Sequence, residues 1–341
     1  MDVSFLEYAI IELTQVCNLR CLHCYNHWKS GKSTAKVLAH SYRKTFNLLD
    51  YLLQHTNVKN IVFTGGEPTL ADRFSELVLH AKLNDRKVTL ITNGNGPEKI
   101  YNQLVSLHID QCEISIHASN PTIYDRITGI SGSWDNAIAT LRLMLANKIA
   151  VTLIIVVTSI NWAYVAKTIR FFYEMGIRHM MVNRYNVGGE GLKHIHLSTT
   201  KDELQQVFSE IDQLAEKHSI RIVSGVCTPH CLLNPEDYPH IGFGSCSGNV
   251  YQRPLTFDPD GNLRMCNHSP VIAGNIYQQS FEEIFSSDYV NEWDCLDEID
   301  HCSKCPLLSA CKGGCRAASE QMGSTLKNAD PIIEALGLKY I

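Results

Sequence analysis

The stretch Cys17-Asn18-Leu19-Arg20-Cys21-Leu22-His23-Cys24-Tyr25 places three thiols close together in the sequence. It follows the apolar run 8–13, which we expect to form a β-strand. The thiols then lie on the loop that ends a strand, where α/β proteins commonly build binding sites. Three cysteines are one too few for a closed tetrahedral metal site or a fully ligated [4Fe–4S] cluster. We therefore expect the three thiolates to hold three irons of a cluster and to leave the fourth iron free to bind a small molecule. The alternative is a loop of incidental thiols.

The spacing Cys-x3-Cys-x2-Cys followed by Tyr25 resembles that of the radical S-adenosylmethionine (SAM) superfamily. This resemblance implies a [4Fe–4S] cluster bound by Cys17, Cys21 and Cys24, with SAM on the open iron. It also implies reductive cleavage of SAM to a 5′-deoxyadenosyl radical that abstracts hydrogen from a substrate. By the same resemblance, His23 and Tyr25 lie near the cluster and the adenine.

The composition of the chain narrows the class of protein. Its 341 residues suffice for one large α/β domain and a smaller one, and a net charge of −5 argues against a nucleic-acid partner. The sequence shows neither a signal peptide nor an apolar run long enough to span a bilayer, so we expect a cytoplasmic protein without membrane association. In a reducing compartment, 13 clustered cysteines indicate metal or redox chemistry rather than disulfides.

Strand-like and helix-like patterns alternate through the first two thirds of the chain. Besides the first strand, we expect strands at 60–63, 87–92, 113–117, 151–157, 179–185 and 220–226, and helices at 35–55, 71–83, 97–107, 133–147, 162–175 and 201–218, the fourth of them capped by Ser133. Repeated βα units predict an α/β fold with a parallel sheet and outer helices. The family resemblance implies a partial (β/α)6 TIM-like barrel, which periodicity alone does not distinguish from a doubly wound sheet.

A glycine pair follows the second expected strand, in Thr64-Gly65-Gly66-Glu67-Pro68. Paired glycines let the backbone approach a ligand closely, and Glu67 offers acceptors to an ammonium group. The stretch resembles the family's GGEP motif, which implies that Gly65, Gly66, Glu67 and Pro68 hold the methionine amino group of SAM.

Further polar residues follow later strands, at the end where parallel sheets build their sites. By resemblance, Asn93 faces the SAM site, with a plain turn as the alternative. Ser115 is expected to bond the ribose or carboxylate of SAM, and Arg126 to pair the carboxylate. The role of His117 stays open between a substrate contact and a core histidine. Weaker candidates, for which a surface loop is an equal alternative, are Thr158, Asn161, Arg184 and the Gly188-Gly189 loop.

A second cysteine group begins at Cys227. Cys246 and Cys266 flank a predicted β-hairpin at 257–263, and Cys302-x2-Cys305-x5-Cys311-x3-Cys315 follows. Both arrangements resemble the SPASM domain, the auxiliary-cluster extension of radical SAM enzymes that modify peptides and proteins. We accordingly expect a radical SAM barrel at 1–226, a SPASM/twitch-like domain at 227–320 and a C-terminal tail at 321–341. Structural zinc is the alternative for the second group.

The family pattern implies the ligands of one or two auxiliary iron–sulfur clusters. It assigns the first cluster to Cys246, Cys266 and Cys315, completed by Cys231 or Cys227, and the second cluster to Cys302, Cys305 and Cys311. The chain lacks the family's final cysteine, roughly a helix length beyond Cys315. The second cluster's fourth ligand therefore stays open between Cys295, a carboxylate such as Asp330 and an open site.

Cysteines left over from the clusters are candidate hydrogen-atom donors, which makes Cys227 and Cys295 the candidate catalytic residues. Cys112 begins a strand and is expected to be a buried structural thiol. Together the resemblances imply maturation of a ribosomally made peptide by crosslinking, epimerisation or oxidation. The alternatives are a sulfatase-maturase-like or tetrapyrrole-modifying enzyme and, in other classes, a non-catalytic iron–sulfur electron carrier or a zinc-binding protein.

Two partners follow from this interpretation. Low-potential clusters imply a flavodoxin- or ferredoxin-type reductant. Only 16 residues precede Cys17, too few for the leader-binding module that many peptide-modifying relatives carry. We therefore expect either a separate leader-recognition protein or direct binding of the peptide or protein substrate.

Overall fold

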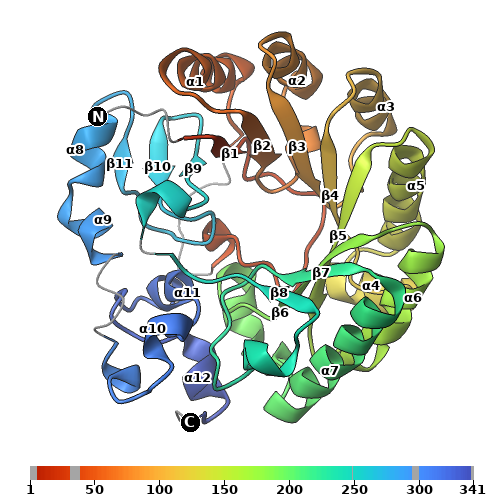
Figure 1. The fold of residues 1–341 in the computed structure, drawn as a ribbon. Coiled ribbons are helices and arrows are strands. Elements are labelled where there is room, and N and C mark those ends of the chain that lie inside the picture. The colour runs from red at the N-terminus through yellow and green to blue at the C-terminus, as the bar shows by residue number, and fades with distance from the viewer. Residues whose placement is uncertain (1–5, 31–38, 248, 294–298, 339–341) are drawn as a thin grey trace.

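One eleven-stranded sheet runs through the residues that the computed structural model describes, 6–30, 39–247, 249–293 and 299–338. Its strands are β1 (Tyr8–Glu12), β2 (Asn60–Thr64), β3 (Lys87–Thr92), β4 (Gln111–Ser115), β5 (Ala150–Val157), β6 (His179–Arg184), β7 (Arg221–Ser224), β8 (Ile241–Phe243), β9 (Thr256–Phe257), β10 (Asn262–Arg264) and β11 (Gly274–Asn275). They lie in the order β11-β10-β9-β1-β2-β3-β4-β5-β6-β7-β8. Because β11 and β8 are its two edges, the sheet curves without closing into a barrel (Figure 1).

The helices of the described residues are α1 (Tyr42–His55), α2 (Phe74–Leu83), α3 (Glu98–Ser106), α4 (Pro121–Thr128), α5 (Ser133–Ala146), α6 (Val165–Glu174), α7 (Lys201–His218), α8 (Phe281–Phe285), α9 (Asp288–Glu292), α10 (Leu308–Cys311), α11 (Arg316–Gln321) and α12 (Pro331–Ala335). In Figure 1, α1, α2, α3, α5, α6 and α7 surround the outer face of the curved sheet. None of these described helices combines the length and the apolar character needed to cross a bilayer.

The central strands are buried on both faces, as parallel strands between helices and a filled interior should be. Ile61, Val62 and Phe63 of β2 are fully buried, and Ala9 and Ile11 of β1 are as well. β1 to β8 pair in parallel, with Ile11 opposite Phe63 in the register of β1 and β2. The predicted α/β fold with a partial barrel is confirmed.

Some details differ from the sequence prediction. β4 ends at Ser115, so His117 lies past the strand rather than within it. Ser133 does not cap α5: Gly132 is the N-cap, and the Ser133 hydroxyl instead donates to Asp125 Oδ1 over 2.9 Å. Neither α4 nor β8 was predicted, because both are short: α4 has eight residues and β8 has three.

The C-terminal, cysteine-rich part continues the sheet. β9 pairs in parallel with β1 and antiparallel with β10, which forms the hairpin predicted at 257–263, and β11 pairs antiparallel with the other side of β10. A buried ion pair of 2.5 Å joins Glu12 of β1 to Arg264 of β10. The predicted domain limits remain predictions, and α11 runs across the expected limit at 320/321.

Candidate functional site

The N-terminal cysteine loop, residues 17–24, follows β1 and brings its three thiols together. Burial raises the pKa of Cys21, and the neighbouring Cys24 and Cys17 raise it further. The half-buried Lys29 belongs to the same group: burial acts to lower its pKa, but Cys24, Cys17 and Cys21 raise it above the ordinary value. Sequence reasoning missed Lys29, which no motif marked. It gives the three thiols a positive neighbour.

The glycine pair fixes the chain just before this loop. Gly66 donates its N–H to the Thr14 carbonyl over 2.6 Å, and Glu67 donates its N–H to the Val16 carbonyl over 2.8 Å. A Cβ on Gly66 would lie 2.2 Å from the Val16 oxygen, and one on Gly65 would lie 2.4 Å from the Thr14 oxygen. Gly65 also has φ +140°, which residues with a side chain rarely adopt. Only glycines allow this approach, and it positions Cys17.

The Glu67 carboxylate points into the protein rather than outward. It is fully buried and accepts hydrogen bonds from the Thr69 hydroxyl (2.6 Å), the Thr92 hydroxyl (2.8 Å) and the N–H groups of Thr69 (3.2 Å) and Asn93 (2.8 Å). Burial raises its pKa, while the hydrogen bonds act against that shift. Glu67 and the buried Pro68, which begins a short 3-10 helix, thus hold the loops after β2 and β3 together.

Of the other predicted SAM contacts, Asn93 lies at the cysteine loop. Its side-chain Nδ2 is 3.7 Å from Cys17 Sγ and donates to Asn18 Oδ1 over 2.9 Å. Ser115 is half-buried at the end of β4, where its carbonyl accepts from the Tyr124 hydroxyl over 3.1 Å. Arg126 lies on α4 and is exposed. The structure therefore joins Asn93 to the glycine pair and the thiols, whereas it places Arg126 on a surface.

The buried His117 and the half-buried His23 form a ring pair beside the same loop. Their rings meet edge to face with centroids 4.5 Å apart. His117 Nδ1 accepts the Val156 N–H over 3.1 Å, and burial lowers the pKa of both rings, that of His23 to about 4. These contacts favour the core-histidine interpretation of His117.

The weaker candidates are buried rather than exposed on surface loops. Asn161 is fully buried, accepts from the Thr158 N–H over 2.7 Å and donates to the His117 carbonyl over 2.8 Å. Arg184 forms a buried ion pair with Asp330. At Gly189, φ is +51° and a Cβ would lie 2.5 Å from the Cys24 carbonyl, so this loop packs directly on the cysteine loop.

Tyr25 connects the N-terminal loop to the second cysteine group. Its hydroxyl accepts from Asn267 Nδ2 over 2.9 Å, its ring lies 4.7 Å from that of His268, and its carbonyl accepts from Gln321 Nε2 over 2.8 Å. Burial raises the Tyr25 pKa, and Cys266 and Cys24 both raise it further. Tyr25 therefore lies between a thiol of each group.

Four thiols of the second group face one another near Tyr25, and we call them the proximal thiol site: Cys227, Cys246, Cys266 and Cys315. The interaction between the Cys227 and Cys246 side chains raises the pKa of Cys227 and lowers that of Cys246, and burial acts to raise both. Asn186 Nδ2 donates to Cys315 Sγ over 3.4 Å. The sequence left open whether Cys227 or Cys231 is the fourth ligand at this site, and in the structure Cys227 lies there.

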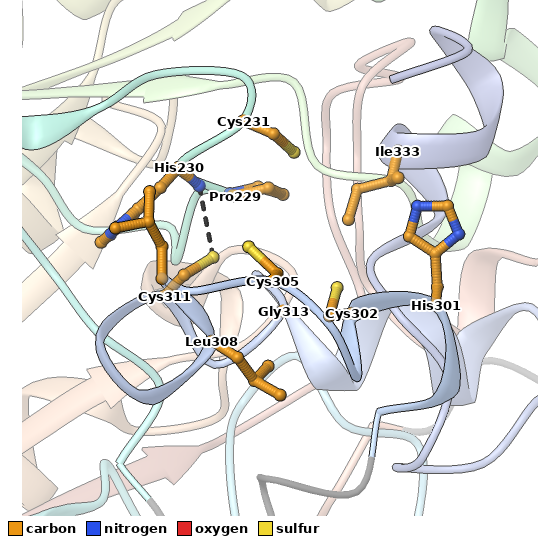
Figure 2. A pocket seen from close by; sticks show the side chains of 11 residues that line it. Pro229, His230, Cys231, His301, Cys302, Cys305, Leu308, Cys311, Gly313 and Ile333 are labelled. Carbon is orange, nitrogen blue, oxygen red and sulfur yellow. Dashed lines mark hydrogen bonds between the residues drawn. The ribbon is translucent and has the colours of Figure 1, made fainter. Parts of the chain in front are cut away.

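Four others line one cavity, shown in Figure 2, and we call them the distal thiol site: Cys231, Cys302, Cys305 and Cys311. Burial raises the pKa of Cys231 to about 11, with Cys311, Cys302 and Cys305 adding to the shift. Cys311 Sγ accepts the His230 N–H over 3.2 Å and also faces the N–H groups of Gly313 and Gly314. Such a set of donors suits a sulfur that carries negative charge.

Two arginines lie beside these thiols, and sequence reasoning missed both. Arg253 packs over the Trp293 ring at 3.6 Å, and its Nη1 lies 3.9 Å from Cys246 Sγ. Arg316 is fully buried and interacts electrostatically with Cys246 of the proximal site and Cys302 of the distal site. Among the described residues, none of its three guanidinium nitrogens has a hydrogen-bond partner. A buried guanidinium without hydrogen-bond partners is costly. Glu320 acts on it electrostatically, and anionic groups at the two thiol sites would balance its charge further.

Two further predicted cysteines belong to neither thiol site as the structure describes it. Cys112 is fully buried in β4, as expected of a structural thiol. Cys295 lies outside the described residues. The twelve described cysteines are all free, and the described ranges hold no group of three or more His, Cys, Asp or Glu that could bind a single metal ion.

Comparison with known proteins agrees with these sites. A model of the radical SAM superfamily matches residues 11–172, and one of SPASM, an iron–sulfur cluster-binding domain, matches residues 246–313. The mycofactocin maturase MftC of Mycobacterium tuberculosis is 28% identical over 329 residues, which cover 94% of this chain and 81% of the relative. The PqqA peptide cyclase of Xanthomonas campestris pv. campestris is 24% identical over 338 residues, covering 96% and 86%.

A solved structure, native anSMEcpe with bound AdoMet and Cp18Cys peptide, has the same fold. It aligns with a TM-score of 0.69 at 18% identity and covers 96% of this chain and 94% of that one. At this identity the likeness concerns the fold alone.

Proposed function

The chain belongs to the radical SAM superfamily and carries a SPASM iron–sulfur domain, and on this premise we propose that it matures a ribosomally made peptide. The enzyme class follows from the family, whereas the peptide substrate is our inference. The observation that supports it most directly is the similarity to a maturase and a peptide cyclase along almost the whole chain, barrel and thiol sites together. Crosslinking, epimerisation and oxidation are the reactions that we expect.

The residues of the N-terminal loop fit the family's cofactors. We propose that Cys17, Cys21 and Cys24 hold the [4Fe–4S] cluster, which when bound supplies the electron that cleaves SAM. The glycine pair leaves room that any Cβ would fill, and Asn93 and Lys29 offer donors beside the thiols. Since the Glu67 carboxylate is engaged by protein donors, we propose that the GGEP stretch meets the SAM amino group through its backbone carbonyls.

The second cysteine group fits auxiliary clusters. We propose that the four thiols of the proximal site bind one cluster, so that Cys227 is a ligand rather than a hydrogen-atom donor. Support comes from the mutual contacts of these thiols and from the unpaired Arg316, whose charge anionic clusters would balance. Cys295 stays a predicted candidate.

We further propose a cytoplasmic location, a flavodoxin- or ferredoxin-type reductant and, for the substrate, either a separate leader-recognition protein or direct binding to the enzyme. The first two follow from the clusters, which need reducing conditions and a low-potential electron source. A full turnover rate with purified enzyme, reductant and precursor peptide alone would dismiss the leader-recognition protein.

The test is anaerobic reduction of the reconstituted protein with SAM and a candidate precursor peptide. We expect 5′-deoxyadenosine and a mass change in the peptide, and neither product from a Cys17/Cys21/Cys24→Ala variant. A protein that retains iron but never cleaves SAM would be an electron carrier instead. Cleavage of SAM without modification of any peptide tried would leave the enzyme class intact and count against the substrate.

A further inference from the structure

We propose that Cys231 supplies the fourth thiolate of the distal site, in place of the family's final cysteine, so that the five residues 227–231 give one ligand to each auxiliary cluster. The inference rests on the proposed function only in taking both thiol sites as iron–sulfur sites. It assigns the ligand that the sequence pattern left open.

The first support is the position of the Cys231 side chain. It lines the same cavity as Cys302, Cys305 and Cys311, and in Figure 2 its sulfur points toward the segment that carries those three. The three thiols are also the neighbours that act electrostatically on Cys231. Four thiols around one cavity form the usual ligand set of a [4Fe–4S] cluster.

The second support is the backbone that holds Cys231 there. The Pro229 carbonyl accepts the N–H groups of Leu232 (2.9 Å) and Leu233 (3.1 Å), which closes a turn around Cys231. The residue before it, His230, donates its N–H to Cys311 Sγ over 3.2 Å. A Cβ on Gly314, whose φ is +82°, would lie 2.7 Å from Pro229 Cγ. The turn therefore packs directly on the segment between Cys311 and Cys315.

The third support is the opposite direction of Cys227. Arg184 Nη2 donates to the Cys227 carbonyl over 2.8 Å, and the thiols that act electrostatically on Cys227 are those of the proximal site, Cys246, Cys315 and Cys266. The turn at Pro229 thus places two cysteines that are four residues apart, Cys227 and Cys231, in different sites. A single site could not explain both placements.

The rival carboxylate is already engaged. Asp330 is buried, pairs with Arg184, and accepts the N–H groups of Cys315 (2.8 Å) and Ile332 (3.0 Å). To bind iron it would have to abandon the Arg184 guanidinium in a buried position, which is strongly unfavourable. Asp330 is therefore a structural partner of the proximal site rather than a ligand of the distal one.

A functional consequence follows. With Cys227 and Cys231 in these roles, each auxiliary site has four protein thiolates, and neither leaves an iron open for substrate. The two auxiliary sites are then suited to electron transfer, and the substrate is held by other groups.

The test uses the full chain with Cys17/Cys21/Cys24→Ala, which retains only the auxiliary sites. After anaerobic reconstitution we expect about eight iron atoms and two reduced-cluster EPR signals. Adding Cys231→Ala should remove one signal, or convert that cluster to a three-iron form, with the loss of one to four iron atoms. Cys231→Ser should retain the iron and shift one signal. Cys112→Ala, a buried thiol away from both sites, is the matched control and should change neither.

Unchanged iron and unchanged EPR signals in both Cys231 variants would overturn the proposal. So would the loss of the same cluster in a Cys295→Ala variant with Cys231 intact. If Cys231→Ala fails to fold, the shifted signal of Cys231→Ser decides alone. Neither SAM nor peptide enters this experiment, so its failure is distinct from failure of the SAM-cleavage assay, which bears on the proposed function.

Discussion

The N-terminal cysteine loop and the C-terminal thiol sites position their sulfurs by opposite means. The loop is held by backbone contacts, since Gly65 and Gly66 press against the carbonyls of Thr14 and Val16. The thiol sites are held among buried charges, with Arg184, Asp330, Arg253 and Arg316 around them. A three-thiol site that must admit a small molecule needs space and precise backbone placement. Sites with four thiols need shielding and charge balance, and the two regions differ accordingly.

The largest effect should come from the glycine pair. Gly66→Ala puts a Cβ within 2.2 Å of the Val16 carbonyl, so the chain before Cys17 must shift. Because small misplacements in a reacting site cost about 100-fold in rate, we expect SAM cleavage to fall by at least that factor. Iron at the auxiliary sites should be unchanged. Gly132→Ala, at a glycine with φ +78° and open space around the added Cβ, is the control for a glycine-to-alanine change that causes no clash. Equal iron loss at all sites would show that the N-terminal loop and the C-terminal thiol sites are not positioned independently.

The next effect concerns the buried charges. Asp330→Ala leaves Arg184, which is 1% exposed, without its ion-pair partner and removes the acceptor of the Cys315 N–H. We expect the free energy of unfolding to drop by about 3–5 kcal/mol. Guanidinium unfolding under anaerobic conditions measures it. Glu7→Ala, which breaks the exposed pair with Lys59, is the matched control and should cost under about 1 kcal/mol. Similar losses in both variants would mean that burial of the Arg184 pair is unimportant.

Arg316 tests the role of charge between the two thiol sites. Arg316→Met removes a cation that favours the reduced, more negative form of each cluster, so both auxiliary reduction potentials should fall by on the order of 100 mV. Arg316→Lys retains the charge and should shift them less. In the protein without iron, we expect Arg316→Met to raise the free energy of unfolding, because methionine removes a buried charge that has no hydrogen-bond partner. Potentials unmoved in redox titrations would contradict the counter-charge role.

The smallest effect should come from the connection between the regions. Tyr25→Phe removes the hydroxyl that accepts from Asn267, next to Cys266, but retains the ring against His268. We expect stability to change by about 1 kcal/mol and SAM cleavage by a few-fold. A loss of SAM cleavage as large as that caused by Gly66→Ala would show that the two regions act as one site.

The sequence predicted what local patterns encode. The Cys17–Tyr25 and Gly65–Pro68 stretches are contiguous, so their positions at strand ends followed from the βα alternation. The partition of Cys227 and Cys231 between two sites did not follow, because it depends on one turn at Pro229. The burial of Glu67 and Arg184 depends on partners far away in the chain, at Thr92 and Asp330. Arg316 carried no signal, because a single arginine beside a cysteine is unremarkable until its surroundings are known.

The pairing of β9 with β1 also affects the order in which the protein folds. Ile10 aligns with Thr256, so one side of the first strand has no partner until some 250 residues have been synthesised. Pairing between strands so far apart in the sequence must overcome a large loop-closure entropy before it stabilises the chain, and this slows folding. The edge of β1 is meanwhile open to other chains, a hazard for aggregation. Metal loading of the C-terminal sites should accordingly be a late event, after β9 has paired with β1.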